Sequence, residues 1–256
     1  MARPAIRALV FDLFDTLVDL HMETTPRAEF AGRPVPRSVV DIHALVCEHR
    51  AIEPSEFLAL MREVDGELRS SRFAKDLEVP TGMRFERLLE RLGIRSAELG
   101  ESLVEAHMSV LRGQVTLVEH HADLLGDLRK SVRIGVCSNF SHSPTAERIL
   151  AESGIAGHLD AVVISDRVGV RKPRPEIFRS VLEALDVAPD ETLHVGDNLH
   201  ADVGGAAALG IRTAWITRRT PDPGAALAAF EGPSPDWQIG DLAELRGILA
   251  GARDPA

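Results

Sequence analysis

The stretch from Ala8 to Leu17 reads ALVFDLFDTL and is the part of the chain that decides the fold. Its first four residues are apolar and include a β-branched and an aromatic side chain, which suits a strand covered on both faces. Asp12 follows at the point where such a strand ends and a loop begins. Because ligands of open parallel sheets bind beyond the carboxyl ends of the strands, Asp12 is either a functional carboxylate or a cap of the following turn.

Four further apolar runs end in polar residues in the same way. Helical patterns alternate with these runs over residues 144–152, 175–185 and 201–209, with proline near the start or glycine after the end. The alternation predicts an α/β fold in which a parallel sheet carries helices on both faces. The predicted strands cover residues 132–137, 161–164, 192–195 and 213–216, and they lead to Ser138, Asp166, Asp197 and Arg218.

The chain between the first two predicted strands is too long for an ordinary crossover. From about Pro36 to Val118 it carries four amphipathic helical patterns, which predict an inserted helical bundle. We expect residues 21–37 to form a loop. After Arg218 we expect a connection rich in Pro, Gly and Ala, a strand over 237–239 and a last helix over 241–249. The predicted domains are a Rossmann-like core of residues 1–20 and 118–256 and an all-α cap of residues 21–117.

Composition excludes some function classes. The chain has 256 residues, a formal net charge of -10 and two cysteines. The negative charge and the lack of a basic stripe argue against nucleic acid as a partner. No apolar run reaches membrane-spanning length and no signal peptide precedes the first strand, so we expect a soluble, cytoplasmic protein without a membrane partner. Cys47 and Cys137 are expected to be buried thiols rather than parts of a disulfide or zinc site.

Four motifs follow one another along the chain: FDLFDTLVD, CSNF, VGVRKPRPEIF and HVGDNLHADVGGAAALG, which begin at Phe11, Cys137, Val168 and His194. In order and spacing they resemble the motifs of subfamily I of the haloacid dehalogenase-like (HAD) hydrolase superfamily, with a helical cap inserted after the first motif. The resemblance covers essentially the whole chain. It implies a Rossmann-like core, an active site covered by the cap, and a small phosphorylated or halogenated substrate.

The same resemblance implies roles for individual residues. Asp12 matches the nucleophile, whose carboxylate attacks phosphorus to form an aspartyl phosphate that water then hydrolyses. Mg²⁺ is the implied cofactor, and its ligands are matched by Asp12, the backbone oxygen of Phe14, Asp197 and Asp202. Three carboxylates that converge without a cation would repel one another, which is a physical reason to expect a metal there.

The second and third motifs supply the remaining site residues. Ser138 and Asn139 match the segment that holds the transferring phosphoryl group, and Lys172 matches a lysine that offsets negative charge. The predicted catalytic residues are therefore Asp12, Ser138 and Lys172, and the predicted substrate-binding residues are Ser138, Asn139 and Lys172. The cap cations are candidates for substrate selection, with a solvated surface as the alternative: Arg27, Arg33, Arg37, Arg72, Lys75 and Arg84.

One position departs from the pattern of the family's phosphatases. Those enzymes carry a second Asp two residues after the nucleophile, which acts as general acid and base. Phe14 stands at that position here, and Asp15, one residue further on, does not count as the missing acid. We therefore expect slow turnover of poor leaving groups unless another residue substitutes. The candidates are His21, His142 and His200, each expected in a loop near the site.

Phe14 also keeps two other functions open. The 2-haloacid dehalogenases of the superfamily have an aromatic residue at this position and use an Asp nucleophile without metal, but they lack the full acidic pair of Asp197 and Asp202. A binding protein that has lost efficient catalysis is the third hypothesis. Mg²⁺-dependent phosphoryl transfer from a small phosphomonoester is ranked first. Neither the substrate nor the oligomeric state can be read from the sequence.

Overall fold

The computed structural model describes residues 4–251, and these form two compact units. The core unit contains the described residues up to Asp19 and those from Thr116 onward. The cap unit contains Leu20–Val115. Strands β2, Val18–Leu20, and β5, Val115–Leu117, pair with each other where the chain passes between the units. That the units act as a catalytic core and a substrate-selecting cap stays a prediction.

A six-stranded sheet forms the centre of the core unit, in the order β10-β9-β8-β1-β6-β7. All of its described pairings are parallel, which confirms the predicted fold class. The chain adds β6 and β7 on one side of β1 and then β8, β9 and β10 on the other, so the strand order reverses at β1. The strands are β1 Ala8–Phe11, β6 Arg133–Ser138, β7 Ala161–Ile164, β8 Thr192–Gly196, β9 Arg212–Ile216 and β10 Trp237–Ile239.

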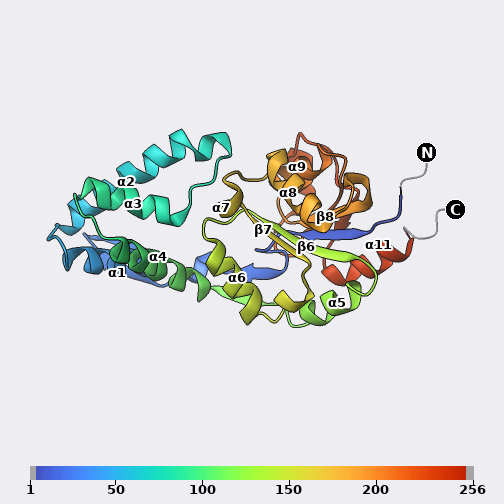
Figure 1. Ribbon diagram of the computed structural model, residues 1–256, viewed down its shortest axis with the longest axis horizontal. Coiled ribbons are helices and arrows are strands. Elements are labelled where there is room, and N and C mark those ends of the chain that lie inside the picture. Colours follow the sequence, from blue (N-terminus) through green and yellow to red (C-terminus); the bar gives the residue numbers. More distant parts are fainter. Residues whose placement is uncertain (1–3, 252–256) are drawn as a thin grey trace. The chain divides into compact units, whose positions relative to one another are not determined.

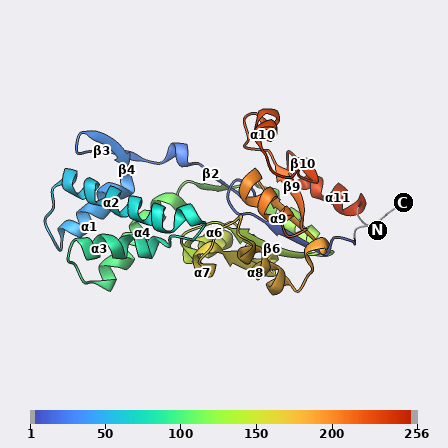
Figure 2. The ribbon, with the colours of Figure 1, turned by 90° about the horizontal axis from the view of Figure 1, so that it is seen from above.

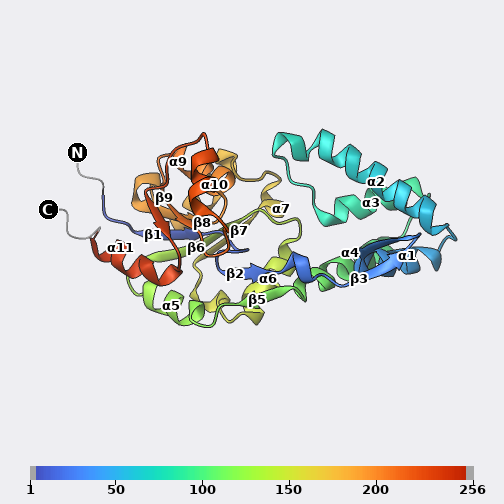
Figure 3. The same ribbon diagram turned by 180° about the vertical axis from the view of Figure 1, so that it is seen from behind.

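Helices cover both faces of this sheet. Helices α8 and α9 lie on one face, and α5, α6 and α11 lie on the other (Figure 1 and Figure 3). On the α8 face, Val10 and Cys137 of the sheet pack with Phe178 and Val181 in one buried apolar cluster. The helices of the core unit are α5 His121–Leu128, α6 Ser143–Glu152, α7 Ser165–Val168, α8 Pro175–Leu185, α9 Gly205–Ala207, α10 Pro223–Ala229 and α11 Leu245–Gly251.

The cap unit contains the four predicted amphipathic helices. Their buried faces form one apolar cluster that includes Val46, Phe57, Leu88 and Leu103. Local signals set the helix starts: the Ser96 hydroxyl accepts a hydrogen bond from the backbone N of Leu99 at 3.1 Å, which satisfies a donor of the first turn. The helices are α1 Arg37–Cys47, α2 Pro54–Ser71, α3 Thr81–Arg91 and α4 Ala97–Arg112.

The segment expected to be a loop over residues 21–37 contains a β-hairpin instead. Strands β3, Arg27–Phe30, and β4, Arg33–Pro36, pair antiparallel, and Figure 2 shows them beside α1. The two turn residues Ala31 and Gly32 have φ of 51° and 73°, which is the turn that suits the twist of a two-residue hairpin. The prolines of β4 are compatible with this, because edge strands tolerate a missing N–H.

Other differences from the predictions lie in the last third of the chain. The helix predicted over 201–209 begins earlier, as a π-helix η5, Leu199–Gly204, that continues into the short α9. The side chain of Asn198 accepts hydrogen bonds from the backbone N of His200 and Ala201, and so sets this earlier start. The connection after Arg218 contains α10, and the last helix is a 3₁₀ turn η6, Leu242–Glu244, followed by α11.

The two cysteines have different surroundings. Cys137 is buried in β6, as predicted, and burial raises the pKa of its thiol to about 12. Cys47 is exposed, contrary to the prediction, because it ends α1 one position after the buried Val46 and so points to a different side of the helix. In the part of the chain that the structure describes, no helix is long and apolar enough to cross a bilayer.

His107 makes the stability of the folded protein depend on pH. Burial, together with the charge of Arg84, lowers the pKa of this histidine from 6.5 to about 4, and its ring packs against Phe85. Between about pH 4 and 6.5, the unfolded chain therefore binds a proton at His107 and the folded chain does not. The free energy of unfolding therefore has its full value above about pH 6.5. It falls by at most about 3 kcal/mol as the pH drops toward 4.

Urea unfolding at pH 7 and pH 4.5 checks this expectation. His107→Gln, which stays neutral at both pH values, should lose less stability on acidification than the wild type. His49→Gln, at an exposed histidine of the same unit, is the matched control and should behave as the wild type. Equal acid sensitivity of the wild type and His107→Gln contradicts the expectation.

Candidate active site

Polar residues follow the three central strands of the core sheet. Asp12 follows β1, Ser138 ends β6 and Asp197 follows β8. The strand register aligns Phe11 with Val136 on one side and with Val195 on the other, so the polar residues at the three strand ends lie at the same edge of the sheet. This edge is the point where the strand order reverses, which is where open α/β sheets bind ligands.

Lys172 is bonded to two buried carboxylates. Its Nζ lies 2.6 Å from Oδ1 of Asp12 and 2.6 Å from Oδ1 of Asp202. The exposed fractions are 4% for Lys172, 8% for Asp12 and 1% for Asp202. Burial by itself lowers the pKa of Lys172, but the two carboxylates outweigh it and hold that pKa above its usual range. The ammonium group therefore stays charged. It connects the segment before α8 to Asp12 and to Asp202.

Asn139 holds the backbone of Lys172 in place. Its Nδ2 donates to the carbonyl oxygen of Lys172 at 3.0 Å, and its Oδ1 accepts from the backbone N of Lys172 at 2.7 Å. The side-chain amide is therefore occupied within the protein. The structure shows Asn139 as a residue that positions Lys172, and its predicted contact with substrate stays a prediction.

Asp202 is held more firmly than its two partner carboxylates. Besides Lys172, its oxygens accept from Nε2 of His194 at 2.9 Å and from the backbone N of Asn198 at 3.0 Å. Burial opposes its ionisation, but Lys172 and His194 outweigh that effect and hold the pKa of Asp202 below its usual range. Gly196 makes room for it, since a Cβ there would lie 2.3 Å from Cγ of Asp202.

Asp197 completes a cluster of three carboxylates. One oxygen each of Asp12, Asp197 and Asp202 lies within 4.8 Å of the others. Burial, with the negative charges of Asp12 and Asp202, raises the pKa of Asp197 to about 8. The indole Nε1 of Trp215 donates to the carbonyl oxygen of Asp197 at 2.8 Å and fixes the backbone at this position.

The charges of this cluster fit a divalent cation. When ionised, the three carboxylates carry three negative charges against the single positive charge of Lys172, which leaves an excess of two. The donors are hard oxygen atoms, which Mg²⁺ prefers. Burial is the main cause of the raised pKa of Asp197, and the negative charges of Asp12 and Asp202 add to it, because a third carboxylate ionises with difficulty beside two others.

Ser138 offers a polar atom without an internal partner. Its side chain is 1% exposed, and its Oγ has no hydrogen-bond partner among the described residues. Buried hydroxyl groups are normally bonded, so an orphan at the end of β6 is suited to an oxygen atom of a ligand.

Phe14 packs against another aromatic ring. Its ring centroid lies 4.9 Å from that of Phe140, and the two planes are tilted by 60°. The neighbouring Asp15 forms an ion pair with Arg219, with Oδ1 2.8 Å from Nε. The position of the usual second acid is therefore apolar, and the nearest carboxylate in sequence is engaged with an arginine.

Comparison with known proteins decides the family. The profile of the haloacid dehalogenase-like hydrolase family matches residues 6–210. The chain belongs to this family. It is 35% identical over 163 residues to a phosphoserine phosphatase of Thermus thermophilus, a match that spans 63% of this chain but only 61% of that protein. It is 31% identical over 213 residues to a glyceraldehyde 3-phosphate phosphatase of Pyrococcus abyssi, spanning 82% and 81% of the two chains.

A solved structure of similar fold carries a different name. A 2-haloacid dehalogenase of Pseudomonas syringae superposes with a TM-score of 0.64 at 22% identity, over 96% of this chain and 99% of that one. At this identity the likeness shows the fold alone. This HAD hydrolase therefore has phosphatases among its sequence relatives and a dehalogenase among its structural neighbours.

Two of the three candidate substitute acids, His142 and His21, have local side-chain partners in the structure. Nδ1 of His142 lies 2.8 Å from Oγ1 of Thr145, at the start of α6. His21 pairs with Glu23 in the cap unit. His200 is exposed and lies in the π-helix η5 rather than in a loop, because that helix begins before it. A role for any of them as general acid stays a prediction.

Sequence reasoning missed two residues of this HAD site, His194 and Trp215. Both lie in buried strands that were recognised only by their apolar neighbours. Each carries a ring nitrogen within a strand that is buried throughout. A buried nitrogen of this kind needs a hydrogen-bond partner, and this was the signal available in the sequence. For His194 the partner is Asp202, and for Trp215 it is the backbone of Asp197.

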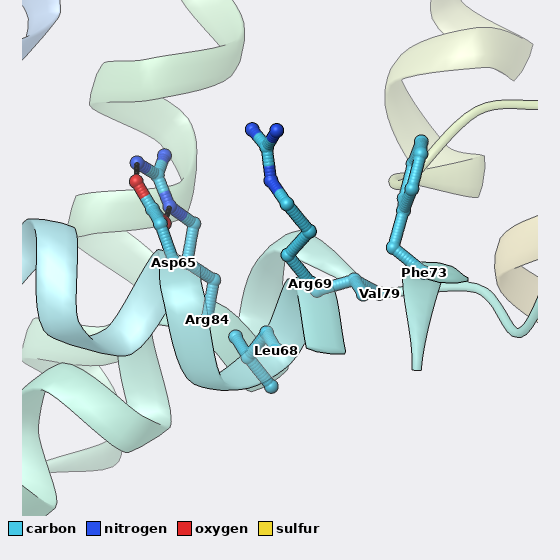
Figure 4. A pocket seen from close by; sticks show the side chains of 6 residues that line it. All are labelled: Asp65, Leu68, Arg69, Phe73, Val79 and Arg84. Atoms are coloured by element: carbon cyan, nitrogen blue, oxygen red, sulfur yellow. Dashed lines mark hydrogen bonds and ion pairs between the residues drawn. The ribbon is translucent and has the colours of Figure 1, made fainter. Parts of the chain in front are cut away.

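The cap unit of this HAD hydrolase contains a hollow of about 290 Å³. One of the predicted selector cations, Arg84, forms a two-pronged ion pair with Asp65, at 2.6 and 2.7 Å. Figure 4 shows the Arg69 guanidinium between this pair and Phe73, pointing away from its helix. Arg72 donates to the carbonyl oxygen of Glu78 instead. Substrate selection by the cap cations stays a prediction, and the hollow adds Arg69 to the candidates.

Proposed function

We propose that this HAD hydrolase is a Mg²⁺-dependent phosphatase that acts on a small phosphomonoester through a phosphorylated Asp12. The observation that carries the proposal is the cluster of three carboxylates around Lys172, with its excess of two negative charges. A dehalogenase has no use for such a site, because halide leaves carbon without a metal or a proton. The sequence relatives named as phosphatases support the same choice.

In the proposed first step, a carboxylate oxygen of Asp12 forms a bond to phosphorus while the ester oxygen leaves with its electron pair. Lys172 orients the Asp12 carboxylate and offsets negative charge in the transition state. The unpartnered Oγ of Ser138 donates a hydrogen bond to a phosphoryl oxygen. In the second step, water attacks phosphorus and releases inorganic phosphate and the free Asp12 carboxylate.

The residues that would hold Mg²⁺ are Asp12, Asp197, Asp202 and the backbone oxygen of Phe14. When bound, Mg²⁺ supplies Lewis-acid activation of the phosphoryl group and neutralises charge. Asp202 already bonds Lys172, His194 and the Asn198 backbone, so its position in the site is set before a cation binds. The ionisation of Asp197 is favoured by the cation, because burial and then the charges of Asp12 and Asp202 raise its pKa in the absence of the ion.

Removal of divalent metal is the test of this proposal. Phosphatase activity in EDTA should fall by about 10²-fold or more, since Lewis-acid activation of a phosphoryl group contributes several kcal/mol. Asp197→Asn should weaken Mg²⁺ binding, measured by calorimetry, because the site loses a charged ligand. Asp190→Asn removes an exposed carboxylate of the same unit and is the matched control.

A panel of phosphomonoesters and 2-haloacids, with and without Mg²⁺, separates the three hypotheses. Turnover of 2-chloropropionate in EDTA, with all phosphate esters inert, would replace the proposal by a dehalogenase. A chain that turns over neither class and fails to bind beryllium fluoride with Mg²⁺ would be a binding protein. Beryllium fluoride mimics a phosphoryl group on a competent Asp nucleophile, so its binding supports the phosphatase.

A further inference from the structure

Two histidines and an aspartate of the core unit form a second cluster, which shares no residue with the Asp12 site. His120 and His121 stand at the start of α5, and Asp241 precedes η6. One potential ligand atom of each residue lies within 4.8 Å of the other two. Nε2 of His120 donates to Oδ1 of Asp241 at 2.9 Å, and the centroids of the two imidazole rings are 4.8 Å apart.

His121 has an unused lone pair inside the protein. Its side chain is 0% exposed, and its Nδ1 donates to the carbonyl oxygen of Leu17 at 2.8 Å. A carbonyl oxygen only accepts, so the proton of the neutral ring lies on Nδ1 and Nε2 is the acceptor. Burial lowers the pKa of His121, which favours the neutral ring. Nε2 is itself buried and has no hydrogen-bond partner among the described residues.

Helix capping accounts for only part of this arrangement. Oδ1 of Asp241 also accepts from the backbone N of Ala243 at 2.8 Å, so this carboxylate caps η6, and His120 could simply be its surface ion-pair partner. Neither contact satisfies Nε2 of His121. A histidine that binds a metal commonly donates its other ring N–H to a backbone carbonyl, and His121 makes that contact with Leu17.

We propose that His120, His121 and Asp241 form a binding site for Zn²⁺ or a closely similar transition-metal ion. Two imidazole nitrogens and one carboxylate oxygen suit such a cation, whereas Mg²⁺ prefers oxygen donors alone. The fourth position of a tetrahedral site is left for water. The two metal sites of the chain therefore differ in donor chemistry, with oxygen atoms at Asp12, Asp197 and Asp202 and mainly nitrogen atoms here.

The cluster must close to reach bonding geometry, because its ligand atoms lie within 4.8 Å of one another. Zinc bonds of about 2.0–2.2 Å in a tetrahedron place ligand atoms roughly 3.3–3.5 Å apart. The side chains of His120 and Asp241 are 48% and 38% exposed, so both can adjust and the ion can enter from solvent. His121 is fixed by Leu17. On binding, the ring proton of His120 passes from Nε2 to Nδ1 by exchange with water, so the neutral ring binds the ion through Nε2. The bond to Asp241 is replaced by bonds of both residues to the ion.

Zinc in this site would join segments that are distant in sequence. His120 precedes α5 and His121 begins it, whereas Asp241 precedes η6. The hydrogen bond of His121 reaches Leu17 in the first motif. The ligand atoms meet only in the folded chain, so the ion stabilises the folded core unit. This proposal does not depend on the proposed phosphatase function.

Zinc titration of the full chain tests the proposal. The protein is stripped with a chelator, returned to excess Mg²⁺ so that the oxygen site is filled, and titrated with Zn²⁺ against a chromophoric competitor. We expect one equivalent bound, with at least a tenfold loss of affinity in His120→Gln and in Asp241→Asn. Asp197→Asn and the exposed His49→Gln should bind as the wild type. These variants avoid the buried His121, whose replacement risks the fold.

Two further measurements make the result decisive. Co²⁺ in place of Zn²⁺ should give the visible absorption of a tetrahedral nitrogen and oxygen site in the wild type and not in His120→Gln. Zinc should raise the melting temperature of the wild type but not of that variant, while both keep equal Mg²⁺-dependent activity without zinc. Equal zinc affinity in the wild type and His120→Gln, or loss of the bound equivalent in Asp197→Asn, overturns the proposal.

Discussion

Asp12→Asn should abolish turnover while leaving the fold intact. The amide is nearly the same size as the carboxylate but is a poor nucleophile, so we expect kcat to fall by at least about 10⁴-fold. The buried Lys172 keeps its second carboxylate partner, Asp202, in the variant. The fold should therefore survive, as circular dichroism and the melting temperature will show. Acid-quenched wild type should carry a phosphoryl group on Asp12, found by mass spectrometry, and the variant should carry none.

Asp15→Asn is the matched control for this experiment. Asp15 lies in the same loop as Asp12, but its carboxylate forms an ion pair with Arg219. We expect this control to keep most of the wild-type activity. Retention of more than a few per cent of activity in Asp12→Asn would rule out covalent catalysis by Asp12. Equal losses in both variants would mean that the loop as a whole, rather than the Asp12 carboxylate, limits the rate.

The elements that the sequence predicted well are those in which one local pattern has one structural solution. A short apolar run with β-branched or aromatic residues, such as ALVF, is typical of a strand in a covered sheet, and β1 has the predicted bounds, Ala8–Phe11. The four helices of the cap unit were equally readable, because their apolar residues recur at the helical period. Carboxylates at strand ends then follow from the parallel sheet.

The elements that were predicted wrongly depend on single side chains or on backbone conformations. The hairpin β3–β4 depends on positive φ at Ala31 and Gly32, and alanine gives no sign of such a conformation. The π-helix η5 depends on Asn198, whose backbone oxygen accepts from Val203 five residues later. Asp202 lies within this π-helix, and π-helices are frequent at functional sites.

The hydrogen-bond geometry inside the site also could not be predicted from the sequence. The motifs named Asp12, Lys172 and Asp202, but not that one ammonium group bonds both carboxylates at the same distance. They named Asn139 as a substrate ligand, which stays a prediction, but not that its side chain bonds the Lys172 backbone. Contacts across 30 residues of sequence or more arise from tertiary packing, so no local pattern encodes them.

Phe14→Asp should speed the hydrolysis of alkyl phosphates by about 10²–10⁴-fold, the usual contribution of a general acid and base. In the wild type, no carboxylic acid stands at this position to protonate the leaving oxygen. The first step should therefore depend strongly on the leaving group. p-Nitrophenyl phosphate, whose phenolate leaves without a proton, should react far faster than an alkyl phosphate. Because no positioned base activates water either, the phosphorylated Asp12 should accumulate and give a burst of product.

Phe14→Asn separates the acid from the change in packing. The Phe14 ring packs 4.9 Å from the Phe140 ring, so both variants lose this contact, but only Phe14→Asp gains a group that can donate and accept a proton. A gain in Phe14→Asp alone therefore measures proton transfer. Equal rates for aryl and alkyl phosphates in the wild type, no burst, and no gain in Phe14→Asp would mean that another group already acts as the acid. His21, His142 and His200 would then be the first residues to replace, since imidazole titrates in the range that such a group needs.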